Sequence, residues 1–181
     1  MIKFNARKLA AVAIAQDINS GTHLYLAGVY LSGDKAVATD GAMMTVATDD
    51  SFDNDGHHIM PVSKKAITAL KNKKADLVIF DNDTLTVYSD RSEVLYLEPY
   101  KEIDGTFPEW KRVVPDDTGV VSHGTFSWSL LERIVQTAKI LNNGLPGISF
   151  KGKGNMEPHV VTYHADADVF SVVMPFRTSD K

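Results

Sequence analysis

Apolar residues recur along the chain at two spacings, one helical and one extended. Residues 6–18 are rich in helix formers and follow Asn5, a residue suited to capping. Leu9, Val12 and Ala13 share one face of the predicted helix. Short runs of branched and aromatic residues come next and predict strands at 24–31, 35–39 and 43–48.

The same order begins again after an acidic, glycine-bearing stretch, 49–56, which predicts an exposed loop. Ser63 can cap a second helix over residues 64–70. Strands are then predicted at 76–80, 85–89 and 93–98.

A third helix is expected after the middle of the chain. Ser129-Leu-Leu-Glu132 fits a capping box, and Asn142-Asn-Gly144 is typical of a helix end. The predicted apolar stripe consists of Leu131, Ile134, Val135, Ala138 and Leu141. Strands are predicted to follow at 147–151, 159–163 and 169–174.

The chain therefore repeats one helix and several short strands three times, with a period of roughly 60 residues. One helix on a small antiparallel sheet cannot bury both faces, so the repeats should pair or stack. We predict an α+β fold with a complete two-repeat domain (1–103), a linker (104–119), a half domain (120–177) and a polar tail (178–181).

The segment Asp104-Gly-Thr-Phe-Pro-Glu-Trp-Lys-Arg-Val-Val-Pro115 is neither helical nor a central strand. Its two prolines remove backbone donors, and Asp-Gly favours a turn. It is nevertheless apolar, and its aromatic side chains require cover. It is either a linker packed between two lobes or the floor of a cleft with Arg112 at its edge.

Composition and charge are those of a water-soluble globular protein. Of 181 residues, 44% are hydrophobic and 23% are charged, and no apolar run approaches the roughly 20 residues of a membrane span. The absence of cysteine excludes disulfides and fits a reducing, cytoplasmic setting. The net charge of −4 argues against a chain that is basic all over, but it leaves room for one basic face.

Three short patches resemble the bacterial DNA polymerase sliding clamp, the beta subunit of the replicative polymerase. They are Ala38-Thr39-Asp40-Gly41, the 104–115 segment, and Val172-Val-Met-Pro-Phe-Arg177 near the end of the chain. Their order implies a middle clamp domain followed by half of the last one. The family forms rings around duplex DNA, has no catalytic site or cofactor, and binds apolar peptides of polymerases and repair proteins. The reduced size suggests a phage- or plasmid-encoded version.

The resemblance implies a peptide cleft at which all three patches meet. Its expected walls are Leu26, Thr39, Gly41, Met44, Pro108, Arg112, Val113, Val172, Met174, Pro175 and Phe176. Apolar walls, an adaptable Met and few polar anchors suit an extended peptide bearing Leu and Phe. Where the family has a polar His-Arg pair, this chain has Ala42 and Met43, which predicts a more apolar rim. The alternative for the wall residues is that they are ordinary core.

The resemblance also implies that the helices face DNA. The residues expected to contact phosphates are Arg7, Lys8, Lys64, Lys65, Lys71, Lys73, Lys74, Arg133 and Lys139. The alternative is a solvated helix face. A clamp ring of two six-repeat chains has twelve repeats, so a ring of three-repeat chains would need four copies. A homo-oligomer, with a tetrameric ring as one form, is therefore expected.

Two other functions remain as alternatives. A clamp mimic would bind the same peptides without encircling DNA. A metal-dependent hydrolase would use His164, Asp166 and Asp168, which alternate along the chain, with help from His57 and His58. Polar hairpin tips show the same pattern, so no metal site is predicted.

Overall fold

The computed structural model describes residues 1–115, 124–141 and 147–176. The α-helices are α1 (Ala6–Val12), α2 (Lys64–Leu70) and α3 (Trp128–Leu141), and the 3-10 helices are η1 (Ala13–Ala15), η2 (Leu24–Ala27) and η3 (Trp110–Val113). The strands are β1 (Ile2–Asn5), β2 (Gly28–Gly33), β3 (Lys35–Thr39), β4 (Met43–Thr48), β5 (Asn54–Pro61), β6 (Ala75–Asp81), β7 (Thr84–Ser89), β8 (Val94–Pro99), β9 (Ile148–Lys151), β10 (His159–Tyr163) and β11 (Val169–Val173).

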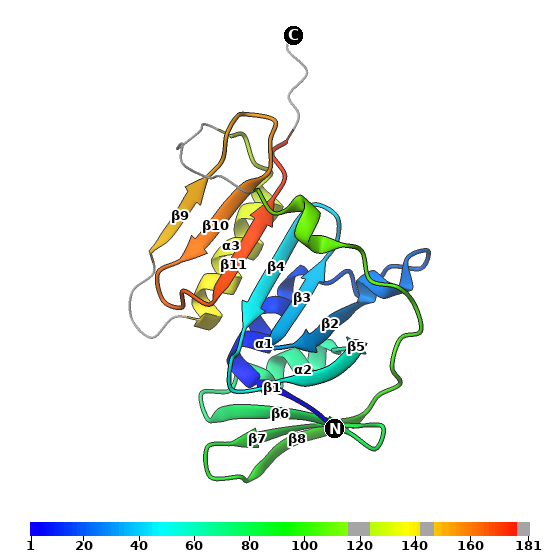
Figure 1. Cartoon of the computed structure of the whole chain (residues 1–181). Coiled ribbons are helices and arrows are strands. Elements are labelled where there is room, and N and C mark those ends of the chain that lie inside the picture. The colour runs from blue at the N-terminus through cyan, green and yellow to red at the C-terminus, as the bar shows by residue number, and fades with distance from the viewer. Residues whose placement is uncertain (116–123, 142–146, 177–181) are drawn as a thin grey trace.

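Each repeat is a helix followed by three antiparallel strands, which confirms the predicted α+β fold. One sheet has the order β1-β6-β7-β8, and the other has the order β5-β2-β3-β4-β11-β10-β9 (Figure 1). The first two repeats exchange a strand: β1 precedes α1 but pairs with β6, and β5 precedes α2 but pairs with β2. This exchange ties residues 1–103 together, while the predicted boundaries of the half domain remain a prediction.

The third repeat joins the first through their last strands. β11 pairs antiparallel with β4, and Ser171 lies opposite Thr45 at the centre of the pair. The two buried hydroxyls are 2.8 Å apart, and the Tyr163 hydroxyl lies 2.7 Å from Ser171 Oγ. Buried hydroxyls with partners hold one register, because a slip would leave them unpaired. The seven-stranded sheet is therefore continuous from the first repeat to the third.

Tyr163 makes this junction sensitive to high pH. Burial raises the pKa of its phenol to about 12, whereas an unfolded tyrosine ionises near 10. The unfolded chain thus loses the proton between pH 10 and 12 while the folded chain keeps it, so stability is intact below pH 10 and falls as the pH rises toward 12. We expect urea unfolding of wild type to lose about 2–3 kcal/mol more than Tyr163→Phe across this window. Equal losses in both proteins would contradict this assignment.

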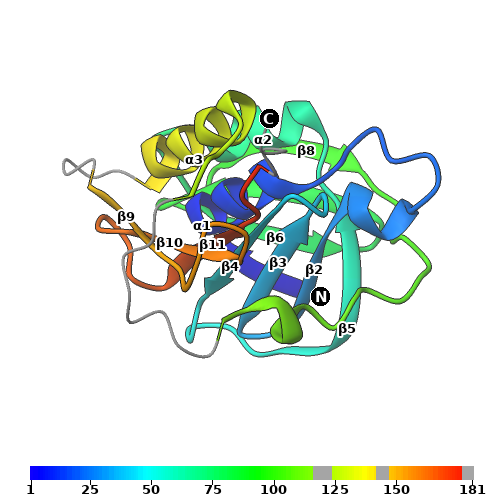
Figure 2. The ribbon, with the colours of Figure 1, turned by 90° about the horizontal axis from the view of Figure 1, so that it is seen from above.

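The helices and the linker cover opposite faces of the large sheet. The three α-helices gather on one side (Figure 2), where α1 contacts both α2 and α3. The main core fills the space between these helices and the sheets, and Phe4, Leu9, Phe80 and Ile134 are fully or almost fully buried there. A smaller apolar cluster lies beneath the linker, around Phe107. In residues 104–115, the linker therefore packs on the sheet through Phe107, Trp110 and Val114.

Four predictions in the first two repeats were wrong. β1 was missed, and the polar start of β5, residues 54–56, was assigned to the 49–56 loop; the Asn54 side chain is held there by hydrogen bonds with the backbone of Lys3 and Gly33. Residues 24–27 are a 3-10 helix instead of strand. The first α-helix ends at Val12, short of the predicted residue 18, and the backbone is extended from Gln16. The buried side-chain amide of Gln16 donates to the Val62 carbonyl. Tertiary contacts override the local pattern at each of these places.

Helix capping was predicted correctly for two helices out of three. The Asn5 side chain accepts from the Arg7 and Lys8 amides, and Ser63 accepts from Ala66. The third helix begins at Trp128, so Ser129 is inside it and the Ser129-Glu132 capping box does not form. Ser127 Oγ accepts from the Leu130 amide instead.

Candidate functional site

Side-chain hydrogen bonds fix the turn between β3 and β4, which is one part of the predicted cleft. Asp40 Oδ1 accepts from the Ala42 and Met43 amides, and the Thr39 hydroxyl donates to the Met43 carbonyl. Gly41 has φ 89°, a conformation that side chains disfavour, and a Cβ there would meet open space. Thr39-Asp40-Gly41 therefore forms a tight turn, and the space next to the Gly41 Cα is unoccupied.

Arg133 of α3 anchors this turn from behind. Its guanidinium donates to Asp40 Oδ2 and, through Nε and Nη2, to the Ile14 carbonyl at 3.2 and 3.0 Å. Both side chains are about three-quarters buried. One side chain of the third repeat thus binds the middle of η1 and the β3–β4 turn of the first repeat.

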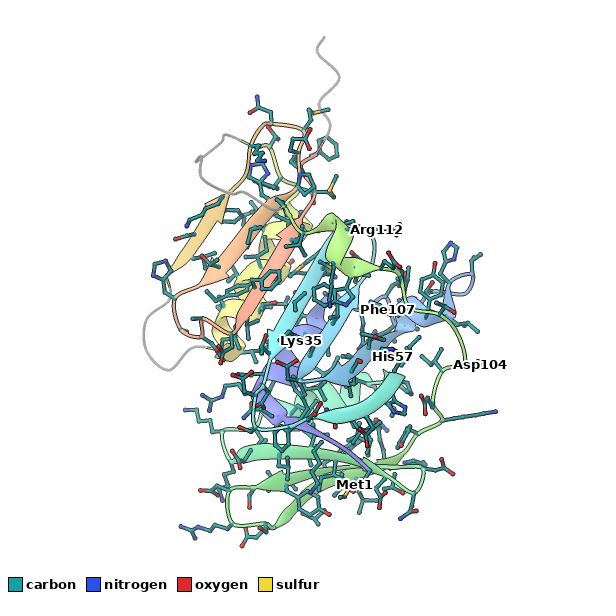
Figure 3. The ribbon with its side chains drawn as sticks, in the orientation of Figure 1. Met1, Lys35, His57, Asp104, Phe107 and Arg112 are labelled. Carbon is teal, nitrogen blue, oxygen red and sulfur yellow. The ribbon has the colours of Figure 1, made fainter. Side chains whose placement is uncertain are left out.

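The linker forms a second wall. Phe107 is buried and stacks on Tyr30 with the ring centroids 4.9 Å apart. This contact brings the linker across the outer face of the sheet (Figure 3) and places η3 beside the β3–β4 turn. Arg112 points away and is paired with Glu109 at the surface.

The chain after β11 supplies the third wall. Val172 lies opposite Met44 in the β4–β11 pair, and both are buried. The Met174 amide then donates to the Ala42 carbonyl at 3.0 Å, which holds the exposed Met174 side chain next to the turn.

These walls enclose an apolar cavity of about 310 Å³. Eight of the predicted cleft residues line it: Leu26, Thr39, Gly41, Met44, Pro108, Val113, Val172 and Met174. Three predicted residues do not: Arg112 and Phe176 are exposed outside the cavity, and Pro175 is buried. Five lining residues were not on the predicted list of walls: Tyr25, Ala42, Met43, Glu109 and Trp110.

A second cavity, of about 620 Å³, lies on the helix side. It is lined by residues from α1, from α3 and from the end of α2 with its following turn: Arg7, Leu70, Lys71, Asn72, Lys73, Gln136, Lys139 and Ile140. Four of the nine residues predicted to face DNA thus converge here. The three α-helices and the 71–74 turn carry nine of the 19 lysines and arginines and one carboxylate, Glu132. The helix side is therefore basic although the chain is acidic overall.

Lys8 and Arg133 of this set make hydrogen bonds inside the chain. Lys8 Nζ donates to Asp168 and to the Thr48 carbonyl, at 2.8 and 2.7 Å. Arg133 binds Asp40 and Ile14, as described above. Lys64 and Lys65 line a shallower hollow on α2, and Lys74 is exposed in the following turn.

Comparison with known proteins identifies the fold. No protein-family profile matches this sequence, and no curated protein matches it. Solved structures do match. A DNA polymerase sliding clamp from Pseudomonas aeruginosa with ligand superposes at TM-score 0.71 and 15% identity, over 98% of this chain and 66% of the clamp chain. The Caulobacter crescentus pol III beta protein superposes at TM-score 0.67 and 18% identity, over 98% and 65%.

The chain has the sliding-clamp fold. A griselimycin-bound DnaN sliding clamp from Bartonella birtlesii agrees, at TM-score 0.63 and 15% identity. This chain spans about 66% of the length of the clamp chains that it matches.

Ala42 and Met43 were predicted to make the rim of the cleft more apolar. Ala42 and Met43 both line the apolar cavity, and Met43 is almost completely buried. In this version of the sliding-clamp fold, that part of the cavity wall is apolar.

The His/Asp cluster does not form a metal centre. Asp168 pairs with Lys8, Asp166 Oδ1 accepts from the Asp168 amide, and His164 Nε2 lies 2.8 Å from Ser149 Oγ. In residues 1–115, 124–141 and 147–176, no group of three or more His, Asp or Glu side chains could hold a metal ion. No helix in the same part of the chain is long and apolar enough to cross a membrane.

Proposed function

We propose that this protein is a sliding-clamp-like processivity factor, a non-enzymatic protein that tethers a polymerase or repair protein to duplex DNA. The observation that carries the proposal is the 310 Å³ apolar cavity, built by the β3–β4 turn, the linker and the chain after β11. Three separate parts of the sequence are held together there by Arg133, Phe107 and the Met174 amide. So specific an arrangement on the outer side of the sliding-clamp fold favours a binding site over incidental packing.

The cavity suits an extended apolar peptide. Met44, Val172 and Val113 provide apolar surface, and Met174 can adjust its shape. The polar groups are few and already have partners: the Thr39 hydroxyl is bonded to the Met43 carbonyl and the Gly41 amide, and the Glu109 carboxylate is paired with Arg112. A peptide would therefore bind mainly by burying Leu- and Phe-type side chains.

The basic helix side supports duplex DNA as the second partner. Lys and Arg contacts to phosphates are independent of sequence and weaken with salt, as tethering along a template requires. Tethering raises the effective concentration of the enzyme at the DNA without any increase in the enzyme's own affinity for DNA. Because one chain has three repeats, we propose that encircling DNA needs several copies, with a tetrameric ring as one form.

Charge reversal on the helix side should test DNA binding. We expect Lys71→Glu/Lys73→Glu to weaken binding to a nicked circular duplex at least tenfold in low salt. The slope of log K against log[salt] should become shallower by about 2, since each lost phosphate contact contributes about 0.9. Fluorescence anisotropy over a salt series measures both quantities.

The matched control is Lys101→Glu/Lys111→Glu, which makes the same charge change at exposed positions outside the three α-helices. It should change binding much less. Equal losses in the two variants would show that only net charge matters and would overturn the assignment of a DNA-facing side.

A clamp mimic is the second candidate. The internal ion pairs of Lys8 and Arg133, which leave fewer cations for phosphates, favour it. Retention on closed circular DNA, lost when the DNA is linearised, supports the processivity factor. Peptide binding without any DNA retention supports the mimic.

A further inference from the structure

Half of the methionines in this chain line the apolar cavity. The chain has six, and Met43, Met44 and Met174 are part of the cavity lining. Met43 and Met44 are almost completely buried, whereas Met174 is 40% exposed. Of these three side chains, that of Met174 is therefore the one open to solvent and to small solutes.

Two further methionines are exposed but lie elsewhere on the molecule. Met156 is 50% exposed in the turn before β10, and Met1 is 74% exposed immediately before β1. Neither lines the cavity. A reaction that depends only on exposure would modify these two as well as Met174, so they serve as internal references.

The backbone around Met174 is fixed on both sides. Its own amide donates to the Ala42 carbonyl at 3.0 Å, and the Phe176 amide donates to the Thr125 carbonyl at 2.6 Å. Pro175, between these two hydrogen bonds, is buried. A more polar side chain at this position would therefore remain at the cavity wall, because the chain that carries it is held in place.

The turn amides next to Met174 have no free hydrogen to offer. The Gly41 amide donates to Thr39 Oγ1, and the amides of Ala42 and Met43 both donate to Asp40 Oδ1. The described residues that line the cavity also include no lysine or arginine. An additional acceptor oxygen at this wall would thus find no partner among the turn amides, and water would have to satisfy it.

We propose that Met174 is a site of reversible oxidation by peroxide, and that its sulfoxide weakens peptide binding at the cavity. The sulfur attacks one oxygen of hydrogen peroxide, an S–O bond forms as the O–O bond breaks, and the second oxygen takes up the remaining proton and leaves as water. The sulfur loses two electrons and the peroxide gains them. Methionine sulfoxide reductases reverse the change with electrons from thiols. The proposal rests on the proposed function, because it concerns regulation of the same peptide site.

The sulfoxide should act on binding and leave the fold intact. A peptide that buries an apolar side chain against Met174 must remove water from the sulfoxide oxygen without supplying a hydrogen bond, which costs free energy. Met43, Met44 and Met60 stay almost completely buried while the chain is folded, so the core keeps its thioethers unchanged. The chain has no cysteine, so no thiol of its own competes for the oxidant.

Peptide mass mapping is the first test. Brief treatment with dilute hydrogen peroxide should add one oxygen to Met174, Met156 and Met1 and leave Met43 and Met44 unmodified. Oxidation of either buried residue as fast as that of Met174 would overturn the assignment of Met174 as the reactive group of the cavity.

The dissociation constant before and after oxidation is the second test. The probe is a short fluorescein-labelled peptide with leucine and phenylalanine side chains, followed by anisotropy. Oxidation of wild type should raise the Kd about tenfold, and reductases for both sulfoxide epimers should restore it. Met156→Leu should show the same tenfold rise. Met174→Leu, whatever its Kd before treatment, should show no rise. Unchanged circular dichroism would exclude unfolding as the cause.

Protection by the peptide gives an independent test. A peptide seated in the cavity covers Met174, so saturating peptide should slow the oxidation of Met174 and leave the rate at Met156 unchanged. Equal rates at Met174 with and without bound peptide would contradict the proposal.

The outcomes separate this proposal from the proposed function. A wild type that binds the peptide equally well after complete oxidation of Met174, or a Met174→Leu protein that loses binding on oxidation as wild type does, would remove only the oxidative regulation. An untreated wild type that does not bind the peptide would remove the peptide site and its regulation together. A Kd that the reductases do not restore would overturn reversibility.

Discussion

Replacing Arg133 with alanine should lower the free energy of unfolding by about 2–4 kcal/mol. The guanidinium makes three hydrogen bonds from the third repeat to the first, and its removal leaves the Ile14 carbonyl and one Asp40 oxygen without these donors. Both partners of the ion pair are largely buried, so water replaces the lost bonds poorly. Urea denaturation followed by circular dichroism measures the change.

Arg112→Ala is the matched control. Arg112 also pairs with a carboxylate, that of Glu109, but its side chain is 79% exposed, and exposed pairs contribute about 0–1 kcal/mol. A loss below about 0.5 kcal/mol in Arg133→Ala, similar to that in the control, would show that the hydrogen bonds of Arg133 contribute little to holding the third repeat on the first. Because Asp40 also shapes the β3–β4 turn, Arg133→Ala should weaken peptide binding as well.

Replacing Met174 with aspartate should weaken peptide binding about 30–100-fold, equivalent to about 2–3 kcal/mol. The new carboxylate would border an apolar cavity whose lining, among the described residues, contains no lysine or arginine. A bound Leu or Phe side chain would then force that carboxylate out of water. The probe is a short fluorescein-labelled peptide with leucine and phenylalanine side chains, and anisotropy gives its Kd.

Phe176→Asp is the control for this experiment. Phe176 is 58% exposed and lies only two residues beyond Met174, but it does not line the cavity. We expect its replacement to change the Kd less than about threefold. Equal effects would place the peptide across the chain terminus instead of in the cavity. Unchanged binding by a folded Met174→Asp protein would remove the cavity from the proposed function.

The sequence predicted the location of the candidate site better than the individual residues that line it. Three sequence patches converge in space, and the linker packs as floor, with Phe107 buried beneath it. The side chains on irregular backbone were placed less well. Arg112 was expected at the cavity edge, but η3 turns it outward, and the same helical turn brings Trp110 into the lining. Tyr25 was assigned to a strand and lines the cavity from a 3-10 helix.

The basic residues were likewise easier to predict as a group than one by one. Their concentration on helices is visible in the sequence, because charge and helical pattern are both local. Whether a given cation is available depends on carboxylates far along the chain. Lys8 meets Asp168, and Arg133 meets Asp40, at separations of 160 and 93 residues.

By itself, the sequence determined the three-fold repeat, the α+β class and the helix caps at Asn5 and Ser63, since periodicity and capping act over a few residues. Only the tertiary structure decided that β1 and β5 are exchanged between repeats, that β11 extends the sheet of the first repeat, and which arc of α3 is buried. Strand pairing joins residues that are distant in the chain, and any apolar strand edge offers the same backbone groups. The choice among edges depends on how the whole chain packs, and so does the exposure of Trp128 and Val135 on α3.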